Sequence, residues 1–312
     1  MANRVYYSSQ GVSVGLQTGT FATVEGGQSV GISANFSLEQ AFQMGRVAIY
    51  DNIMTEGEVT ITTSKILDGN DTIYKLATGA AGLSPIVNQS ETEFKVRVAS
   101  NTSEGATALD AAAQLGTEVT GCFLSSVSYT IPSDGFATEE VSFVGDNKAV
   151  GSSKSVTAPS GSTTRATYRQ MFNQAGSSLP SEVSGLNVTN VAISADFGRE
   201  AMFKLGQFRP FHRYANFPFE VTCEFTVSNT STDQSPIDLD GVTATSDGNL
   251  PSKQNIIVKL ADAQGFGGSH GYEFHVSGAR LNTLSQDGGD TGGGNATTTL
   301  GYQTFNELSI SG

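Results

Sequence analysis

Alternating hydrophobic and polar positions predict β-strands along most of the chain. The clearest run is 219–227, where apolar residues occupy every second position. A period of two is typical of a strand with one buried face. The apolar positions of this run are Phe219, Val221, Cys223, Phe225 and Val227. Further strands are predicted at 30–36, 59–67, 93–99, 122–131, 137–144, 191–197, 254–260, 272–277 and 298–306.

Two of these strands belong to an internal repeat. Residues 30–45 and 191–206 lie 161 positions apart and are identical at eight of 16 positions. Weaker matches follow in the same order downstream, among them Glu58-Val59-Thr60 and Glu220-Val221-Thr222. A repeat this long exceeds the unit of a solenoid, so it indicates a tandem duplication of a domain. We predict a first β domain at 1–145, a Ser-, Gly- and Pro-rich connector at 146–188 and a second β domain at 189–312.

A short helix is predicted after the first strand of each copy. Ser37 and Gln40 fit a capping box, and Gly45 and Gly206 fit the left-handed residue that ends a helix. The helix is expected to pack back on its strand through aromatic residues. The expected core residues are Ile32, Phe36, Phe42, Ile193, Phe197 and Phe203. The predicted fold class is mainly β, with two β-sandwich or barrel domains in tandem, each with a short flanking α-helix.

Composition and charge exclude several classes of protein. Only 15% of residues are charged and there are 18 Phe and 9 Tyr, which argues against a disordered chain and against a helical bundle. The net charge is −13. A protein that holds nucleic acid statically needs a broad basic face, which this chain lacks.

No motif indicates catalysis or a cofactor. The two cysteines make neither a disulfide framework nor a zinc site, and the chain holds no HExxH or G-x-S-x-G motif. We therefore expect no enzyme, no metal and no cofactor. The first ten residues carry no apolar run and no stretch approaches ~18 apolar residues, so neither a signal peptide nor a membrane anchor is expected.

One cluster of basic residues stands out in the second copy: Arg199, Lys204, Arg209 and Arg213. It is either a patch that docks on an acidic face of a neighbouring copy or a solvated face that pairs with Glu200. The corresponding stretch of the first copy holds Arg46 among Asp51, Glu56 and Glu58. A head-to-tail assembly in which copy one meets copy two would use this difference in charge.

Three segments resemble the tail tube proteins of tailed bacteriophages. They are Val191-Ala-Ile-Ser-Ala-Asp-Phe-Gly-Arg-Glu-Ala-Met-Phe-Lys-Leu-Gly206, Phe208-Arg-Pro-Phe-His-Arg-Tyr-Ala-Asn-Phe-Pro-Phe-Glu-Val-Thr-Cys-Glu-Phe225 and Leu124-Ser-Ser-Val-Ser-Tyr-Thr-Ile-Pro-Ser-Asp-Gly-Phe-Ala-Thr-Glu-Glu-Val-Ser-Phe-Val-Gly145. The resemblance covers both copies but neither the connector nor the first 20 residues. It implies a β-sandwich with a flanking helix whose strands join those of neighbours into a ring, and rings that stack into a tube that conducts DNA.

The resemblance implies a structural subunit of the virion tail, assembled in the host cytoplasm. Its partners would be further copies of itself, other tail proteins and double-stranded DNA that passes an acidic lumen without specific binding. Two copies per chain favour a ring of three chains with six similar domains, and a ring of six chains is the alternative. Two other functions remain open, a surface adhesin or carbohydrate-binding module of two β-sandwiches and another component of a virion shell. Whether the tail is contractile stays open too.

Overall fold

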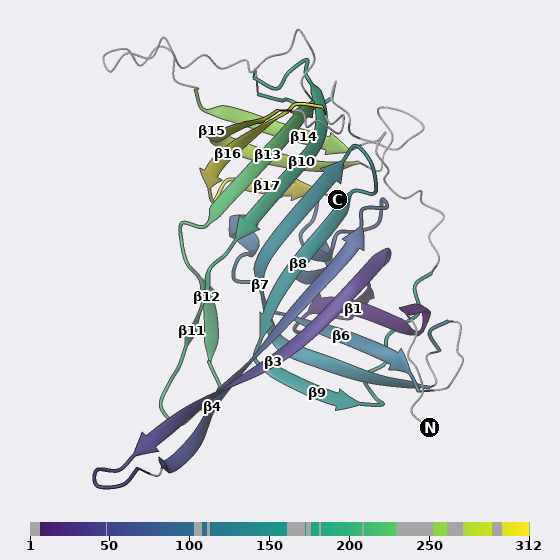
Figure 1. The fold of residues 1–312 in the computed structure, drawn as a ribbon. Helices are drawn as coiled ribbons and strands as arrows, with labels where there is room; N and C mark the ends of the chain where they lie inside the picture. Colours follow the sequence, from purple (N-terminus) through teal and green to yellow (C-terminus); the bar gives the residue numbers. More distant parts are fainter. Residues whose placement is uncertain are drawn as a thin grey trace.

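The computed structural model describes residues 7–47, 49–102, 108–110, 113–160, 172, 176–180, 182–207, 209–228, 252–260, 271–288 and 295–311. The fold is mainly β: fifteen strands are linked by hydrogen bonds into one antiparallel sheet, and two more form a small second sheet (Figure 1). The strands are β1 (Gln10–Leu16), β2 (Ala22–Thr23), β3 (Gly27–Phe42), β4 (Ile49–Ile66), β5 (Ser84–Pro85), β6 (Phe94–Asn101), β7 (Gln114–Pro132), β8 (Thr138–Gly145), β9 (Asn147–Gly151), β10 (Asn187–Asp196), β11 (Arg199–Met202), β12 (His212–Ala215), β13 (Glu220–Ser228), β14 (Gln254–Leu260), β15 (Tyr272–Asp287), β16 (Thr297–Phe305) and β17 (Leu308–Ser311). The helical segments are α1 (Ile73–Thr78) and the short 3-10 turns η1 (Tyr7–Ser9) and η2 (Ile86–Gln89).

Eight strands form a continuous inner layer. Their order is β3-β4-β8-β7-β10-β13-β16-β15, with every neighbouring pair antiparallel. The order of the first four strands recurs in the last four, and we call residues 10–151 the first unit and 187–311 the second unit. Aligned partners across three strands are Ile32, Ile61 and Phe143 in the first unit and Ile193, Cys223 and Tyr302 in the second.

The last strand of each four-strand set, β7 or β15, is also its longest, and part of it belongs to an outer layer. The first part of β7 pairs with β6 and β9, and the first part of β15 pairs with β14 and β17. Both strands carry an irregularity in register at the same place, between Leu124 and Ser126 of β7 and between Leu281 and Thr283 of β15. The hydrophobic core lies between the inner and outer layers and runs through both units as one cluster.

The predicted strands are confirmed. Val221, Cys223, Phe225 and Val227 of β13 are all buried, as the alternation predicts. Within the segment predicted as a connector, β9 pairs with β7, so the ordered first unit continues to Gly151. Residues 161–171 of that segment lie outside the described residues.

The two predicted helices are wrong. Residues 37–42 continue β3, and residues 199–202 form β11, which pairs with β12. Gly45 and Gly206 do adopt positive φ, of 91° and 85°, but as turn residues of two β-hairpins. The helix signals are local, whereas each segment finds a partner strand across the hairpin, and this pairing decides the conformation.

The predicted core residues divide between the two copies. Ile193 and Phe197 are fully buried, but Ile32 is only half-buried. Phe36, Phe42 and Phe203 are 62%, 71% and 47% exposed, so their assignment to the core of the chain is wrong. The physical reason is that a strand–helix contact was expected where the chain instead extends away from the sheet as a hairpin (Figure 1).

Candidate functional site: the sheet edges and the two hairpins

The two units are joined by one pair of strands. β7 and β10 pair from Asn190 opposite Pro132 to Asp196 opposite Ser126. Just beyond β10, the N–H of Phe197 donates to the carbonyl of Ser125 at 2.9 Å. We call this pairing the internal joint.

The outer edges of the inner layer are the repeat counterparts of the two strands in the internal joint. β3 occupies the place in the first unit that β10 has in the second, and β15 corresponds to β7. In the described part of the chain, β3 pairs only with β4, and residues 280–287 of β15 pair only with β16. One edge of the sheet is therefore complementary in strand position and direction to the other.

The hairpin of β11 and β12, here the second hairpin, lies against the first unit (Figure 1). The Arg199 side chain is 2% exposed. Its Nε donates to the carbonyl of Leu124 at 2.7 Å and its guanidinium also donates to the carbonyl of Ser90. Burial lowers the pKa of Arg199 to about 10, against the opposing effect of the nearby Glu91 carboxylate. The guanidinium thus fills a site made by the first unit.

Arg213 of the same hairpin binds two carboxylates of the first unit. Its Nε donates to Asp146 Oδ1 at 2.7 Å, and its Nη1 donates to Glu58 Oε2 at 2.9 Å. Burial raises the pKa of Asp146, and the Arg213 guanidinium opposes that rise. His212 contributes as well, with Nε2 2.9 Å from Glu91 Oε2 and its ring 5.3 Å edge-on from Phe123.

The predicted basic cluster therefore separates into two pairs. Arg199 and Arg213 are buried against the first unit of the same chain, whereas Lys204 and Arg209 are exposed near the turn of the hairpin. Lys204 lies 5.8 Å from the ring of Phe211. Glu58 belongs to the acidic stretch of the first copy that was expected to meet this cluster, and the structure pairs it with Arg213 within one chain. Glu91 and Asp146 were not predicted, because nothing in their spacing from the arginines signals the contact.

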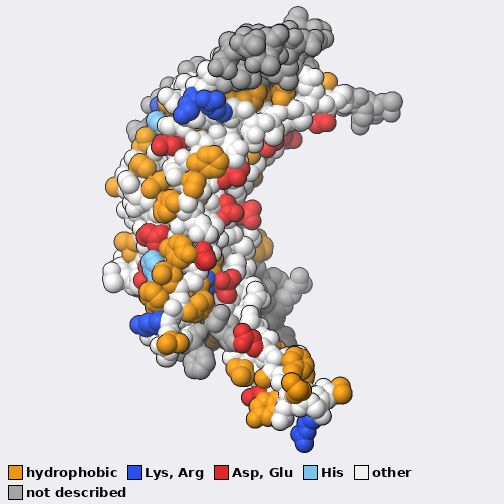
Figure 2. Space-filling view, turned by 90° about the vertical axis from the view of Figure 1, so that its left-hand side faces the viewer, with side chains coloured by type: hydrophobic (Ala, Val, Ile, Leu, Met, Phe, Trp, Pro, Cys, Tyr) orange, Lys and Arg blue, Asp and Glu red, His pale blue; other side chains and the backbone are white. Residues whose placement is uncertain are grey.

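The end of the β3–β4 hairpin, here the first hairpin, projects from the molecule and carries many exposed apolar side chains (Figure 1). It appears at the foot of the molecule in Figure 2 as a cluster of hydrophobic groups. Its exposed apolar residues are Phe36, Leu38, Phe42, Met44, Val47, Ile49, Tyr50, Ile53 and Met54. Gathered apolar surface of this kind marks an interaction site.

The exposed face of the inner layer is lined by hydroxyl and carboxyl side chains. Residues opposite one another on paired strands share a face, so the register places Ser33, Ser128 and Ser194 on the side away from the core. The carboxylates on this face are Glu58, Glu140, Asp196, Glu220, Glu224 and Asp287. Figure 2 shows the molecule as a crescent with Asp and Glu side chains along its hollow side.

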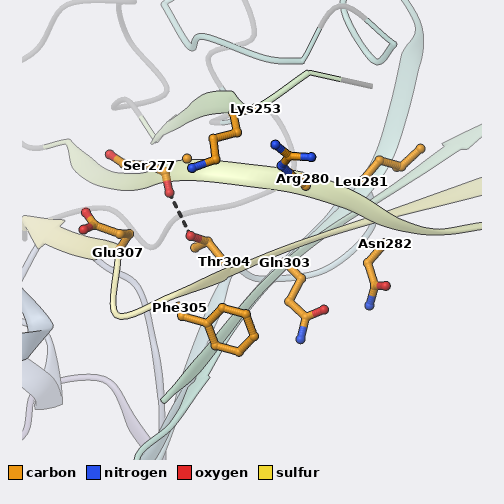
Figure 3. Close-up of a pocket in the computed structure, with 10 residues that line it drawn as sticks. Lys253, Ser277, Arg280, Leu281, Asn282, Gln303, Thr304, Phe305 and Glu307 are labelled. Carbon is orange, nitrogen blue, oxygen red and sulfur yellow. Dashed lines mark hydrogen bonds between the residues drawn. The ribbon is translucent and has the colours of Figure 1, made fainter. Parts of the chain in front are cut away.

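Beside β15 and β16 the structure has an open cavity of about 710 Å³ (Figure 3). Its residues come from the middle of β15, from the end of β16 and from the segments next to β14 and β17. They are Lys253, Ser277, Gly278, Arg280, Leu281, Asn282, Gln303, Thr304, Phe305 and Glu307. Thr304 Oγ1 donates to the carbonyl of Ser277 at 3.0 Å and holds one wall in place.

In the part of the chain that the structure describes, no three His, Cys, Asp or Glu side chains gather as metal ligands would. Among the same residues, no helix is long and apolar enough to cross a membrane. The chain matches no family model and no curated protein sequence.

Proposed function

We propose that the chain is a structural, non-enzymatic subunit of a bacteriophage tail tube. Two tail-tube-like β-sandwich units in each chain line a ring, and rings stack into a tube with other tail proteins in the virion. The observation that carries the proposal is the pair of edges, β3 and residues 280–287 of β15, which each pair with a single strand among the described residues and are the counterparts of the internal joint between β10 and β7. Repeating that joint between chains extends the sheet head to tail.

Closure of the sheet gives a physical reason for a ring. A long exposed strand edge presents unpaired N–H and carbonyl groups and is prone to pair with another chain. A heterologous contact of this kind either closes into a ring or runs on as an open filament. Three chains would supply six units, and a ring of three chains accounts for the near-identical order of strands in both units. A ring of six chains is the alternative.

The charge of the concave face supports a passage for DNA. The hollow side of the crescent carries carboxylates among short Ser and Thr side chains (Figure 2). Negative side chains repel phosphates and offer no sites that hold the DNA backbone. In the proposed ring this face turns inward, and double-stranded DNA slides past it without specific binding.

Cysteine pairs test the proposed ring at the level of register. In the internal joint Ser194 lies opposite Ser128, and their counterparts at the free edges are Ser33 and Ser285. Opposite residues on antiparallel strands have Cα atoms about 4.5–5.5 Å apart, within the range that a disulfide spans. The native Cys122 and Cys223 are buried, and burial raises the pKa of both thiols, so they do not compete.

Oxidised S33C/S285C is expected to give covalent trimers on non-reducing gels and rings in negative-stain micrographs. S128C/S194C is the matched control and gives a cross-link within one chain. S33C/D287C places the second cysteine two residues out of register and gives little product. Covalent hexamers would show a ring of six chains and not of three. A chain that stays monomeric at high concentration, without rings or cross-links, would refute the tube proposal and favour an adhesin or carbohydrate-binding module.

A further inference from the structure

The cavity beside β15 and β16 corresponds to an occupied place in the first unit. By register, Leu281, Asn282 and Phe305 are the counterparts of Leu124, Ser125 and Asp146. The latter three receive the second hairpin, through Arg199, the Phe197 N–H and Arg213 respectively. In the second unit, the described residues place nothing in this position, and a cavity of about 710 Å³ remains.

We propose that this cavity is a socket for the first hairpin of a second copy of the chain. The inference rests on the head-to-tail pairing proposed above and adds the residues that fill the contact. Phe36 and Leu38 are the counterparts of Phe197 and Arg199. Docked in the same way, the Phe36 N–H faces the carbonyl of Asn282 and the Leu38 side chain lies over Leu281.

The exposure of Phe36 supports this occupant. Phe197 is fully buried and packs on Phe219 with ring centroids 4.8 Å apart. Phe36 is 62% exposed, and Gly57 stands where Phe219 stands in the second unit. Gly57 thus leaves the face of Phe36 without an aromatic neighbour in its own unit, and we infer that a residue of another chain covers it.

The charges of hairpin and socket are reversed between the internal contact and the proposed contact. The second hairpin brings Arg199, Arg213 and His212 to a socket that holds the carboxylates of Glu91, Asp146 and Glu58. In the first hairpin the counterparts are Leu38, Asn52 and Asp51. The cavity in turn carries two cations, Lys253 and Arg280, against one carboxylate, Glu307 (Figure 3).

One ion pair between chains follows from the register. His212 packs edge-on against Phe123. By register, the counterparts of these two residues are Asp51 and Arg280. Asp51 of one copy is therefore placed beside Arg280 of the next. The excess of cations in the socket and of carboxylates on the first hairpin, Glu39 and Asp51 against Arg46, also disfavours the wrong pairing, in which a chain would dock its first hairpin on the acidic first unit of another.

A charge exchange in the S33C/S285C background tests the socket. R280D and D51R, each alone, are expected to reduce the yield of rings and of cross-linked trimers by about tenfold, because like charges then meet in the contact. D51R combined with R280D restores the yield to within about threefold of the parent. K148D changes an exposed lysine of β9, away from the socket, and is the matched control that leaves the yield unchanged.

Each result decides between the two proposals. Restoration by the double variant supports the socket, and F36E, which places a charge against Asn282, should then block assembly as well. If R280D assembles like the parent, or if the double variant is no better than the single ones, the socket is refuted while the ring stands. If the parent gives neither rings nor cross-links, both are refuted. Because Asp51 and Arg280 are exposed, the variants are expected to fold. Circular dichroism spectra of the monomeric variants that match the parent's would show this.

Discussion

The second hairpin and the first hairpin leave equivalent strands of the two units, yet among the described residues only the second packs against the other unit. Around the second hairpin, Phe197, Arg199 and Arg213 are buried, and the two guanidinium groups donate hydrogen bonds to the first unit and to the hairpin itself. Around the first hairpin, the counterparts of the first two, Phe36 and Leu38, are 62% and 65% exposed. Two differences separate the hairpins: the second rests on the first unit, and Phe219, which covers Phe197, is replaced by Gly57 beside Phe36.

The largest contrast is expected between F197A and F36A. Truncating a fully buried phenylalanine costs about 3–5 kcal/mol of unfolding free energy, whereas truncating an exposed one in the monomer should cost less than about 1 kcal/mol. F36A should instead reduce ring formation. Urea unfolding of the monomer and micrographs of the same samples measure both effects. Equal losses of stability in the two variants would show that Phe36 is buried within its own chain.

A second contrast separates R213M from N52M. Arg213 is 3% exposed and bonds to Asp146 and Glu58, so its removal leaves a half-buried carboxylate without its cation. We expect R213M to lower the unfolding free energy by about 2 kcal/mol, and N52M to leave it within about 0.5 kcal/mol. Thermal unfolding of the two variants measures this difference. An unchanged unfolding free energy in R213M would mean that water replaces the hydrogen bonds of the arginine at no cost in stability.

The turns of the hairpins should behave alike. A Cβ at Gly45 or Gly206 would contact nothing within 4 Å, so the cost of an alanine comes only from the positive φ. G45A and G206A are each expected to destabilise the monomer by roughly 1 kcal/mol. A much larger loss at Gly206 alone would show that the difference between the hairpins extends to their turns.

The smallest expected effect tests whether the outer layers of the two units behave alike. Burial raises the pKa of Glu118, but hydrogen bonds from Lys154 and Arg97 outweigh it and hold the pKa below 4.5. The hydrogen bond from Lys259 likewise lowers the pKa of Glu273. A carboxyl with a lowered folded pKa stabilises the fold above its unfolded value and loses that contribution as the pH falls below about 4.5.

E118Q and E273Q should therefore each flatten the loss of stability between about pH 4.5 and the folded pKa of the group. The change is smaller for Glu273, whose side chain is 35% exposed against 12% for Glu118. Unfolding midpoints measured across this range of pH check both variants. A profile unchanged by either variant would mean that the ion pairs are broken in solution.

Strands were predictable where one face is buried, as in β13, because burial imposes a period of two on the residues themselves. The hairpins were not, since Ser37, Gln40 and Gly45 satisfy the local rules for a helix and the deciding contact is with a strand further along the chain. Helix α1 was missed for the converse reason. It has six residues, four of them buried, and too few turns to show a helical period.

The candidate site was predictable only in part. The basic residues of the second hairpin stand out by composition, and the difference in charge between the copies was visible in the sequence. The individual pairs were not, although Glu58 had been named in the acidic stretch of the first copy. Asp146 and Glu58 lie 67 and 155 positions from Arg213, and pairing over such distances is set by the order of strands. The free edges became visible only when each strand had been assigned its neighbours.

The internal joint has a consequence for the speed of assembly. Because β7 and β10 belong to one chain, their pairing is an intramolecular step that proceeds at high effective concentration during folding. In a ring of three chains, half of the joints are complete before two molecules meet, and nucleation depends on the encounter of three particles where single-unit subunits would need six. Synthesis of one chain thus already provides the first contact between two units. A ring can therefore start at protein concentrations too low for separate units to associate.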